Sequence, residues 1–291
     1  MSKVCFYLSV VIILALSPLW SAIAATGFKG DTSECRNLLD SQNYTKAVSI
    51  CMQDAEAGNS AAQSNLSVMY SFGWGVSKNE AEALRWLRAS ADQRYPPAQY
   101  ALSSQYATGT GVPKDTIQAL GLLTDSANQG FALAQVMLGH MYESGYEKLG
   151  IEKDLGAAIK WYREAAVQCD ACQYELWRIY YFGLGVDKDF VEAARYLKKA
   201  AEGGLPKAQM QLAFRYLDGE GVPKDNVHAY KWFYIAEKGG EPRAKGALPL
   251  LSRNMSRSEI AEAKTLADDT TAKFVINTNL LCALYNQFCG K

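Results

Sequence analysis

One pattern of residues recurs five times in this chain of 291 residues. Each copy has a Gln, a Tyr seven positions later and a Gly ten positions later, and successive copies are spaced by 36, 36, 38 and 36 residues. The copies start at Gln63, Gln99, Gln135, Gln173 and Gln209. A fixed period in this range indicates stacked copies of one supersecondary unit rather than a single globular core. It also favours a binding function over catalysis, because stacked units present long surfaces.

Each copy carries the signals of two helices joined by a tight loop. In the third copy Ala134, Leu138 and Tyr142 are spaced by four residues and share one helical face. A glycine loop, mostly Gly-x-Gly-Val, ends the first helix, and an Asn or Asp follows where it can cap the second. These caps are Asn79, Asp115, Asp154, Asp189 and Asp225. A Glu or Gln three residues later predicts a reciprocal capping box in three copies, at Glu82, Gln118 and Glu192.

The second helix carries an Ala followed three residues later by a large residue. We expect the tryptophans at this position, Trp86, Trp161 and Trp232, to lie in the core. One helix pair cannot bury its apolar face alone, so neighbouring pairs must stack. The sequence therefore predicts an all-α protein, an α-solenoid of helix-turn-helix repeats.

The order Ala-Gln-x-x-Leu-Gly-x-x-Tyr, Gly-x-Gly-Val, Asp, Ala, Trp, Ala-Ala resembles the Sel-one-like repeat (SLR), a relative of the tetratricopeptide repeat. The resemblance implies a right-handed superhelix whose first helices line a concave face. Family members are mostly adaptors, regulators and host-interaction proteins, often exported from bacteria. A few cysteine-rich relatives are described as β-lactam-binding or β-lactamase-like.

This resemblance and the flanking patterns predict the domain organisation. The predicted segments are a signal peptide at 1–24, a degenerate helical hairpin at 25–60, repeats at 61–96, 97–131, 132–170, 171–205 and 206–240, and a capping helix with a disulfide-pinned tail at 241–291. We place the capping helix at about 256–267, where a polar-faced helical pattern resembles the terminal cap of such arrays.

The N-terminus has the pattern of a secretory signal. Lys3 precedes an apolar run from Val4 to Leu16, and Ala22 and Ala24 form a small-residue cleavage site. The alternative is an uncleaved membrane anchor, although the 17 residues from Val4 to Trp20 fall short of the roughly 20 that a spanning helix needs. Export predicts a periplasmic or secreted protein with no membrane insertion after cleavage.

The charge balance of the mature chain does not call for a nucleic-acid partner. Without Lys3, 29 of the 30 basic residues remain against 30 acidic ones.

Cleavage would remove Cys5 and leave six of the seven cysteines. They fall in three local pairs, which we predict to be disulfides in an oxidising compartment. The pairs are Cys35 with Cys51, Cys169 with Cys172, and Cys282 with Cys289. Redox chemistry or a zinc site at Cys169 and Cys172 is the alternative, but a redox role needs a βαβ setting and zinc needs two further ligands.

A partner surface is expected on the first helices, at one, five and eight positions after each repeat Gln. This face becomes aromatic and apolar toward the C-terminus, which is unusual for a solvated face. The candidate partner-binding residues are Tyr100, His140, Tyr174, Arg178, Tyr181 and Phe214. The alternative is that these side chains pack on the adjacent repeat or on the C-terminal tail, and for Phe214 we favour the tail.

Motifs for catalysis are missing from the sequence. The chain has no Gly-x-Ser-x-Gly, no phosphate loop, no His-Glu-x-x-His and no serine followed by a lysine three positions later. We therefore predict a non-catalytic scaffold or regulator that binds a protein or extended peptide in the cell envelope, with no cofactor or metal. The alternatives are a β-lactam-binding or β-lactamase-like hydrolase, which nitrocefin turnover would reveal, and a secreted effector or host-factor binder.

Overall fold

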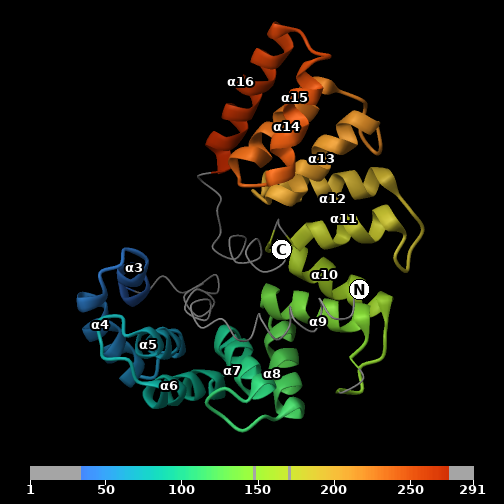
Figure 1. The fold of residues 1–291 in the computed structure, drawn as a ribbon. Coiled ribbons are helices and arrows are strands. Elements are labelled where there is room, and N and C mark those ends of the chain that lie inside the picture. The colour runs from blue at the N-terminus through green and yellow to red at the C-terminus, as the bar shows by residue number, and fades with distance from the viewer. Residues whose placement is uncertain (1–33, 147–148, 170–171, 275–291) are drawn as a thin grey trace. The chain divides into compact units, whose positions relative to one another are not determined.

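The structure is a computed structural model that describes residues 34–146, 149–169 and 172–274. Over these residues its regular structure is helical, apart from one isolated antiparallel bridge between Tyr146 and Ile151 in the lengthened loop of the third repeat (Figure 1). The predicted all-α solenoid is thereby confirmed. The helices are α3 (Glu34–Asp40), α4 (Tyr44–Glu56), α5 (Ser60–Phe72), α6 (Glu80–Asp92), α7 (Pro96–Thr108), α8 (Thr116–Asn128), α9 (Ala132–Ser144), α10 (Leu155–Ala166), α11 (Gln173–Phe182), α12 (Phe190–Glu202), α13 (Pro206–Asp218), α14 (Asn226–Lys238), α15 (Pro242–Ser252) and α16 (Arg257–Phe274).

The chain forms two compact units. Unit 1 comprises Met1–Leu138 with Tyr146–Glu152, and unit 2 comprises Gly139–Gly145 with Lys153–Lys291. The division falls within helix α9, so the last two turns of α9 belong to unit 2.

Unit 1 begins with the short helix α3, which packs on α4 ahead of the first repeat. Its first core cluster lies between these helices, α5 and α6, and includes Leu39, Leu66, Met69 and Trp86. None of the helices in the described part of either unit is long and apolar enough to cross a membrane. The predicted signal peptide lies outside the described residues.

Unit 2 ends in two helices where the sequence predicts one. Helix α14 packs against α13, α15 and α16. Sequence reasoning overlooked α15 because this helix contains Pro249 and Gly246, residues that usually disfavour a helix interior. Helix α16 covers the predicted capping segment and continues to Phe274.

The predicted helix caps are present in all five repeats. In each case the cap side chain accepts a hydrogen bond from a backbone N–H in the first turn of the second helix. The reciprocal half of the predicted capping boxes differs, because the backbone N–H of each cap residue donates to the carbonyl of the repeat Tyr (Asn79 to Tyr70, for example). Glu82 and Glu192 instead form ion pairs with Arg85 and Arg195 one turn along the helix.

The side chain of the repeat Gln connects neighbouring repeats. In four of the five repeats its side-chain amide donates to a backbone carbonyl in the last turn of the preceding helix, and three of these carbonyls also accept a backbone N–H from the loop that follows, as Ala55 does from Gly58. These bonds run from Gln63 to Ala55, Gln135 to Ala127, Gln173 to Ala166 and Gln209 to Ala201, at 3.1–3.2 Å. The repeat Gln therefore joins neighbouring repeats through its amide nitrogen, while the buried amide oxygens of Gln135, Gln173 and Gln209 have no hydrogen-bond partner in the described part of the chain.

The second loop glycine also connects neighbouring repeats. A Cβ at Gly221 would lie 1.9 Å from the carbonyl oxygen of Phe190, in the first turn of α12. Gly75 makes the same kind of approach to α4, while Gly111 has nothing within 4 Å. All three have positive φ. Glycine at this position thus permits both the left-handed backbone and the close approach of the preceding repeat.

The most buried large side chain of each second helix is one residue beyond the predicted position. Four residues after the Ala of the repeat the structure buries Leu87, Leu123, Tyr162, Leu197 and Phe233. Trp86 and Trp232 are buried as predicted, but Trp161 is only half-buried, so its assignment to the core is wrong. The reason is geometric: positions three and four lie on the same helical side, and in the third repeat the interior position belongs to Tyr162.

Candidate functional site

The first turns of α11 hold a row of aromatic residues in unit 2. Trp177 stands where the other repeats have a small residue, and it is almost completely buried. Its ring centroid lies 4.7 Å from that of Tyr174 and 5.5 Å from that of Tyr181. The two half-buried tyrosines therefore rest on the buried Trp177. Burial is the main cause that raises the pKa of Tyr174 to about 12, with a smaller contribution from the Glu175 carboxylate.

Beside this row lies a network of charged and polar side chains from α9, α10 and α11. Arg178 donates through one terminal nitrogen to both carboxylate oxygens of Glu143, at 2.5 and 2.6 Å, and through Nε to Glu175 at 3.2 Å. The Tyr162 hydroxyl donates to Glu143 at 2.8 Å and lies 2.8 Å from Nδ1 of His140. Because the hydroxyl has a single proton, His140 is the donor in the second contact when Tyr162 donates to Glu143. We call these five residues the polar network.

Burial and the neighbouring carboxylates shift the pKa of Arg178, the cation of the polar network, in opposite directions. Burial lowers the pKa of Arg178, but Glu175 and Glu143 outweigh it, so the net pKa is raised and the guanidinium stays charged. Burial, with the Glu175 and Glu143 carboxylates, also raises the pKa of Tyr162, which keeps its proton. Arg178 is thus held by internal ion pairs, which limits its use as a contact for a partner.

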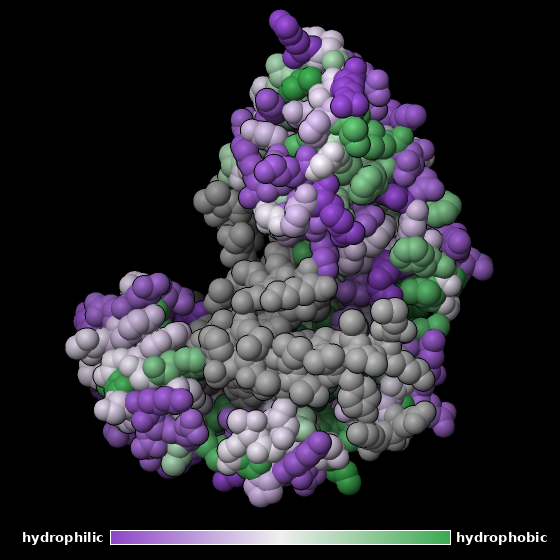
Figure 2. Space-filling model, viewed as in Figure 1, coloured by the Kyte–Doolittle hydropathy of each residue, from purple (hydrophilic) through white to green (hydrophobic). Residues whose placement is uncertain are grey.

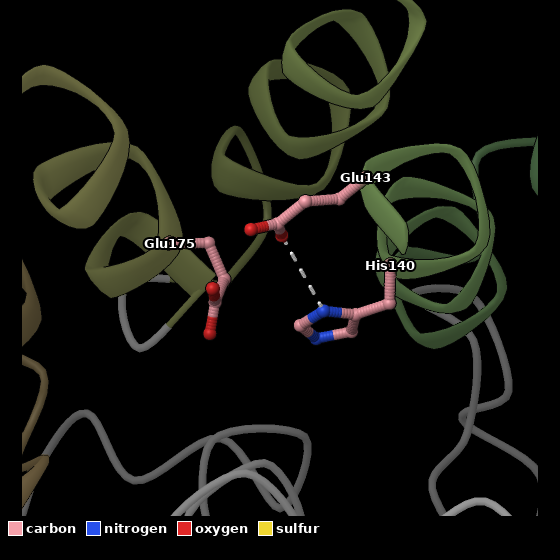
Figure 3. Close-up of side chains that lie close together, drawn as sticks. All are labelled: His140, Glu143 and Glu175. Atoms are coloured by element: carbon pink, nitrogen blue, oxygen red, sulfur yellow. Dashed lines mark ion pairs between the residues drawn. The ribbon is translucent and has the colours of Figure 1, made fainter. Parts of the chain in front are cut away.

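Three members of the polar network could in principle hold a metal ion. Ligand atoms of His140, Glu143 and Glu175 lie within 4.8 Å of one another, and Figure 3 shows the three side chains converging from two helices. The two carboxylates are, however, already paired with Arg178, whose positive charge replaces that of a cation. The arrangement therefore supports a structural role, in which one arginine joins α9 to α11.

Two residues that differ from those at the same positions of the other four repeats create the space for this network. Tyr162 occupies the interior position that is Leu or Phe in the other repeats, and Gly139 faces it from α9. A Cβ at Gly139 would lie 2.5 Å from the Tyr162 ring. The corresponding residues elsewhere are Ser67, Ser103, Trp177 and Ala213. Glycine at this one position therefore accommodates the larger tyrosine ring.

We expect Gly139→Ala to lower the free energy of unfolding by about 1–2 kcal/mol, although alanine favours a helix over glycine, because the added methyl overlaps the ring. The pair Gly139→Ala with Tyr162→Leu should recover part of this loss, since leucine fills the position in other repeats. Urea denaturation of the wild type, both single variants and the double variant measures the coupling. Strictly additive losses would contradict the proposed contact.

The structure describes two of the three predicted cysteine pairs. The Sγ atoms of Cys35 and Cys51 are 2.10 Å apart, joining α3 to α4. Those of Cys169 and Cys172, both buried, are 2.45 Å apart between α10 and α11. Both are assigned as disulfides. The predicted Cys282–Cys289 pair lies outside the described residues.

The remaining predicted partner residues have different surroundings. Tyr100, in unit 1, is only 8% exposed and its ring centroid lies 5.5 Å from that of Phe131. Phe214 of α13 is half-buried with its edge toward Phe233, at a centroid distance of 5.0 Å. These placements do not test partner binding, which stays a prediction for the whole set.

A cluster of apolar side chains lies where α11 ends and α12 begins. Of its members, only Tyr181 was among the partner-binding residues predicted from the sequence. Phe182 is 52% exposed and Phe190 is 40% exposed, and the Tyr181 ring centroid lies 4.9 Å from the first and 5.3 Å from the second. Val191 beside them is also exposed. We call these four residues the aromatic edge. Figure 2 shows hydrophobic, green surface at the right of the view, over the part of the molecule where Figure 1 places α11 and α12.

Polar groups border the aromatic edge on the side of α13. The guanidinium of Arg215 lies 4.5 Å from the centroid of the Tyr181 ring and pairs with Glu220. The Tyr181 hydroxyl donates to Glu220 at 2.8 Å. Burial and this hydrogen bond raise the pKa of Tyr181. Sequence reasoning missed Phe182 and Phe190 because they lie outside the three positions that it inspected; their signal was the run of aromatic residues around Gly183.

Comparison with known proteins agrees with this architecture. The chain shares 29% identity with a Sel1 repeat protein from Oxalobacter formigenes, over 79% of this chain and 94% of that one, with a TM-score of 0.64. It shares 26% identity with c5321, a protective antigen of uropathogenic Escherichia coli with an SLR fold, over 84% of this chain and 59% of that one, with a TM-score of 0.49. No curated protein sequence matches the chain.

A sequence model of the Sel1 repeat supplies the assignment. It matches the chain at residues 60–95, 96–131, 132–166, 171–205 and 206–241, which together are more than half of its length. These five matches correspond to the five copies of the Gln-Tyr-Gly pattern, and the helix pairs α5–α6 to α13–α14 fall within them. The chain belongs to the Sel1 repeat family.

Proposed function

We propose that this protein is an exported, non-catalytic interaction scaffold that binds another protein or an extended peptide in the cell envelope. Sel1 repeats typically mediate protein–protein interaction, which supports the binding role. The signal-like N-terminal sequence supports export. The pairing of Cys35 with Cys51 also fits an oxidising compartment such as the periplasm.

The observation that carries the binding proposal is the exposure of the aromatic edge. Phe182, Phe190 and Val191 are exposed to solvent beside Tyr181. Other apolar residues of the same repeat, such as Leu197, are buried. Exposed aromatic side chains with a polar rim are the chemistry of interface hot spots. The partly exposed Glu220, held by the buried Arg215, provides such a polar border here. The partner that fits is a segment with apolar anchor residues flanked by polar groups.

We expect Phe182→Ser with Phe190→Ser to reduce partner capture at least tenfold while the protein stays folded. The reason is that neither side chain belongs to the buried core, since Phe182 is 52% exposed and Phe190 is 40% exposed. The measurement is crosslinked pull-down from the cell-envelope fraction of the source organism with the mature chain, quantified by mass spectrometry.

Ile117→Ser is the matched control for this experiment. Ile117 is 83% exposed and stands two residues after the Asp115 cap, as Val191 stands two residues after Asp189, so it tests exposed apolar character in another repeat. Equal capture by the double serine variant and the wild type would refute the site. An alkaline phosphatase fusion to residues 1–30 tests export separately, and an inactive fusion would refute the envelope location without affecting the site.

A further inference from the structure

A second apolar region of unit 2 lies at the opposite end of α11. Tyr174, in its first turn, and Phe214, in the middle of α13, are both half-buried. They occupy positions one and five after the repeat Gln, on the same side of the first helices. Both helices pack against α12, and their side chains meet where the guanidinium of Arg215 lies 4.5 Å from the centroid of the Tyr181 ring. We call the region around Tyr174, Phe214 and the half-buried Leu217 the α11–α13 face.

The end of the described chain lies close to this face. Lys238, at the end of α14, pairs with Asp268 of α16 at 3.3 Å. The next residue, Gly239, packs on Pro206 at the start of α13, where an added Cβ would be 3.1 Å from the proline ring. Helix α16 then continues to Phe274. The chain therefore leaves α16 within a few turns of the start of α13.

The start of α15 follows the end of α14 directly, next to the ion pair between Lys238 and Asp268. Glu241 and Arg243 follow Lys238 within five residues and pair with each other at 3.2 Å. Their charges are the smallest of the influences on the pKa of Tyr174, which burial raises to about 12.

The sequence beyond Phe274 has the length and composition to cover such a face. Residues 275–291 number 17, which reach at most about 56 Å when extended. They contain no Asp or Glu and a single Lys. Their large apolar residues are Val275, Ile276, Leu280, Leu281, Leu284, Tyr285 and Phe288. The α11–α13 face borders the carboxylates of Glu143 and Glu175. A segment without carboxylate side chains can cover this face without charge repulsion.

We propose that residues 275–291 dock onto the α11–α13 face of the same chain and cover Tyr174 and Phe214. The occupant is this segment rather than a second copy of the protein or a foreign partner, because it is covalently attached next to the face and therefore present at high effective concentration. The proposal leaves the aromatic edge, at the other end of α11, available for a partner. It does not depend on the proposed function.

A photo-crosslinking residue in place of Phe288 in the full mature chain tests this directly. Benzoyl-phenylalanine is the probe, because it preserves an aromatic side chain at that position. We expect crosslinks within one chain to peptides of α11 and α13. Crosslinks that join two chains, crosslinks to α3–α8 only, or no crosslinks within the chain would each overturn the proposal. The same probe in place of the exposed Ile117 measures the background.

Hydrogen–deuterium exchange in the full chain provides the second measurement. We expect Leu284→Asp with Phe288→Asp to raise exchange at least tenfold in the first turn of α11 and around Phe214, because charged residues cannot cover an apolar face. Asn286→Ser changes the same segment at a polar position without adding charge and should change little. Exchange in α5 and α7 reports whether the protein stays folded. If the double variant leaves α11 and α13 as protected as in the wild type, docking does not occur.

Discussion

Gly221→Ala is expected to lower the free energy of unfolding by about 3–4 kcal/mol, the sum of backbone strain and overpacking. Gly221 has φ of +75°, a conformation that costs an alanine about 1–2 kcal/mol. Its new Cβ would also meet the Phe190 carbonyl oxygen at 1.9 Å. Backbone atoms in a helical turn cannot move aside as a side chain can, so the loop would have to separate from the preceding repeat.

Gly111→Ala separates the two contributions. Gly111 occupies the same loop position in the second repeat with φ of +71°, but nothing lies within 4 Å of an added Cβ. We expect it to lose only the backbone term, about 1–2 kcal/mol. Urea denaturation monitored by circular dichroism compares the two variants. Because repeat arrays can unfold in parts, exchange protection of α12 and α13 should be followed as well. Equal losses in both variants would show that the close approach does not constrain the loop.

Arg178→Met is expected to lower the free energy of unfolding by about 3 kcal/mol, because it leaves two carboxylates without their cation. Methionine keeps much of the length and packing of the arginine stem, so the loss reports the charge. Thermal unfolding of the variant and the wild type at neutral pH measures the loss.

Arg195→Met is the control for the arginine experiment. Arg195 also pairs with a glutamate, Glu192, at 2.6 Å, but on the surface of α12. Exposed pairs of this kind contribute less than about 1 kcal/mol. Combining Arg178→Met with Glu143→Gln and Glu175→Gln should restore part of the stability by removing the unpaired charges. If Arg178→Met loses no more than Arg195→Met, the polar network has no structural role.

The repeat architecture could be predicted from the sequence because local signals encode it. Caps such as Asp189, loop glycines such as Gly221 and the regular Gln each act within one unit or between neighbours, so the period reveals them. The exact interior position could not be predicted, because apolar residues three and four places after the Ala share a helical side. Packing between helices decided in favour of Tyr162 over Trp161.

The polar network was beyond sequence reasoning for a different reason. Glu143 and Arg178 are 35 residues apart, and only the packing of α9 against later helices brings them together. A signal was nevertheless present. Gly139 and Tyr162 both differ from the residues at the same positions of the other repeats of this chain, and they occur in the same repeat. Two such differences within one repeat are candidates for direct contact.

The glutamine bonds between repeats have an evolutionary consequence. Each such bond joins equivalent atoms of successive repeats. Deletion or duplication of a 36-residue segment that keeps the reading frame would therefore recreate the same bond at the new boundary. Duplication of a repeat in the gene would therefore keep this connection at most boundaries between repeats. The boundary at Gln173 is different, since its bond reaches back seven residues instead of eight and lies beside Cys169 and Cys172. Recombination there would break a connection that no other unit can replace.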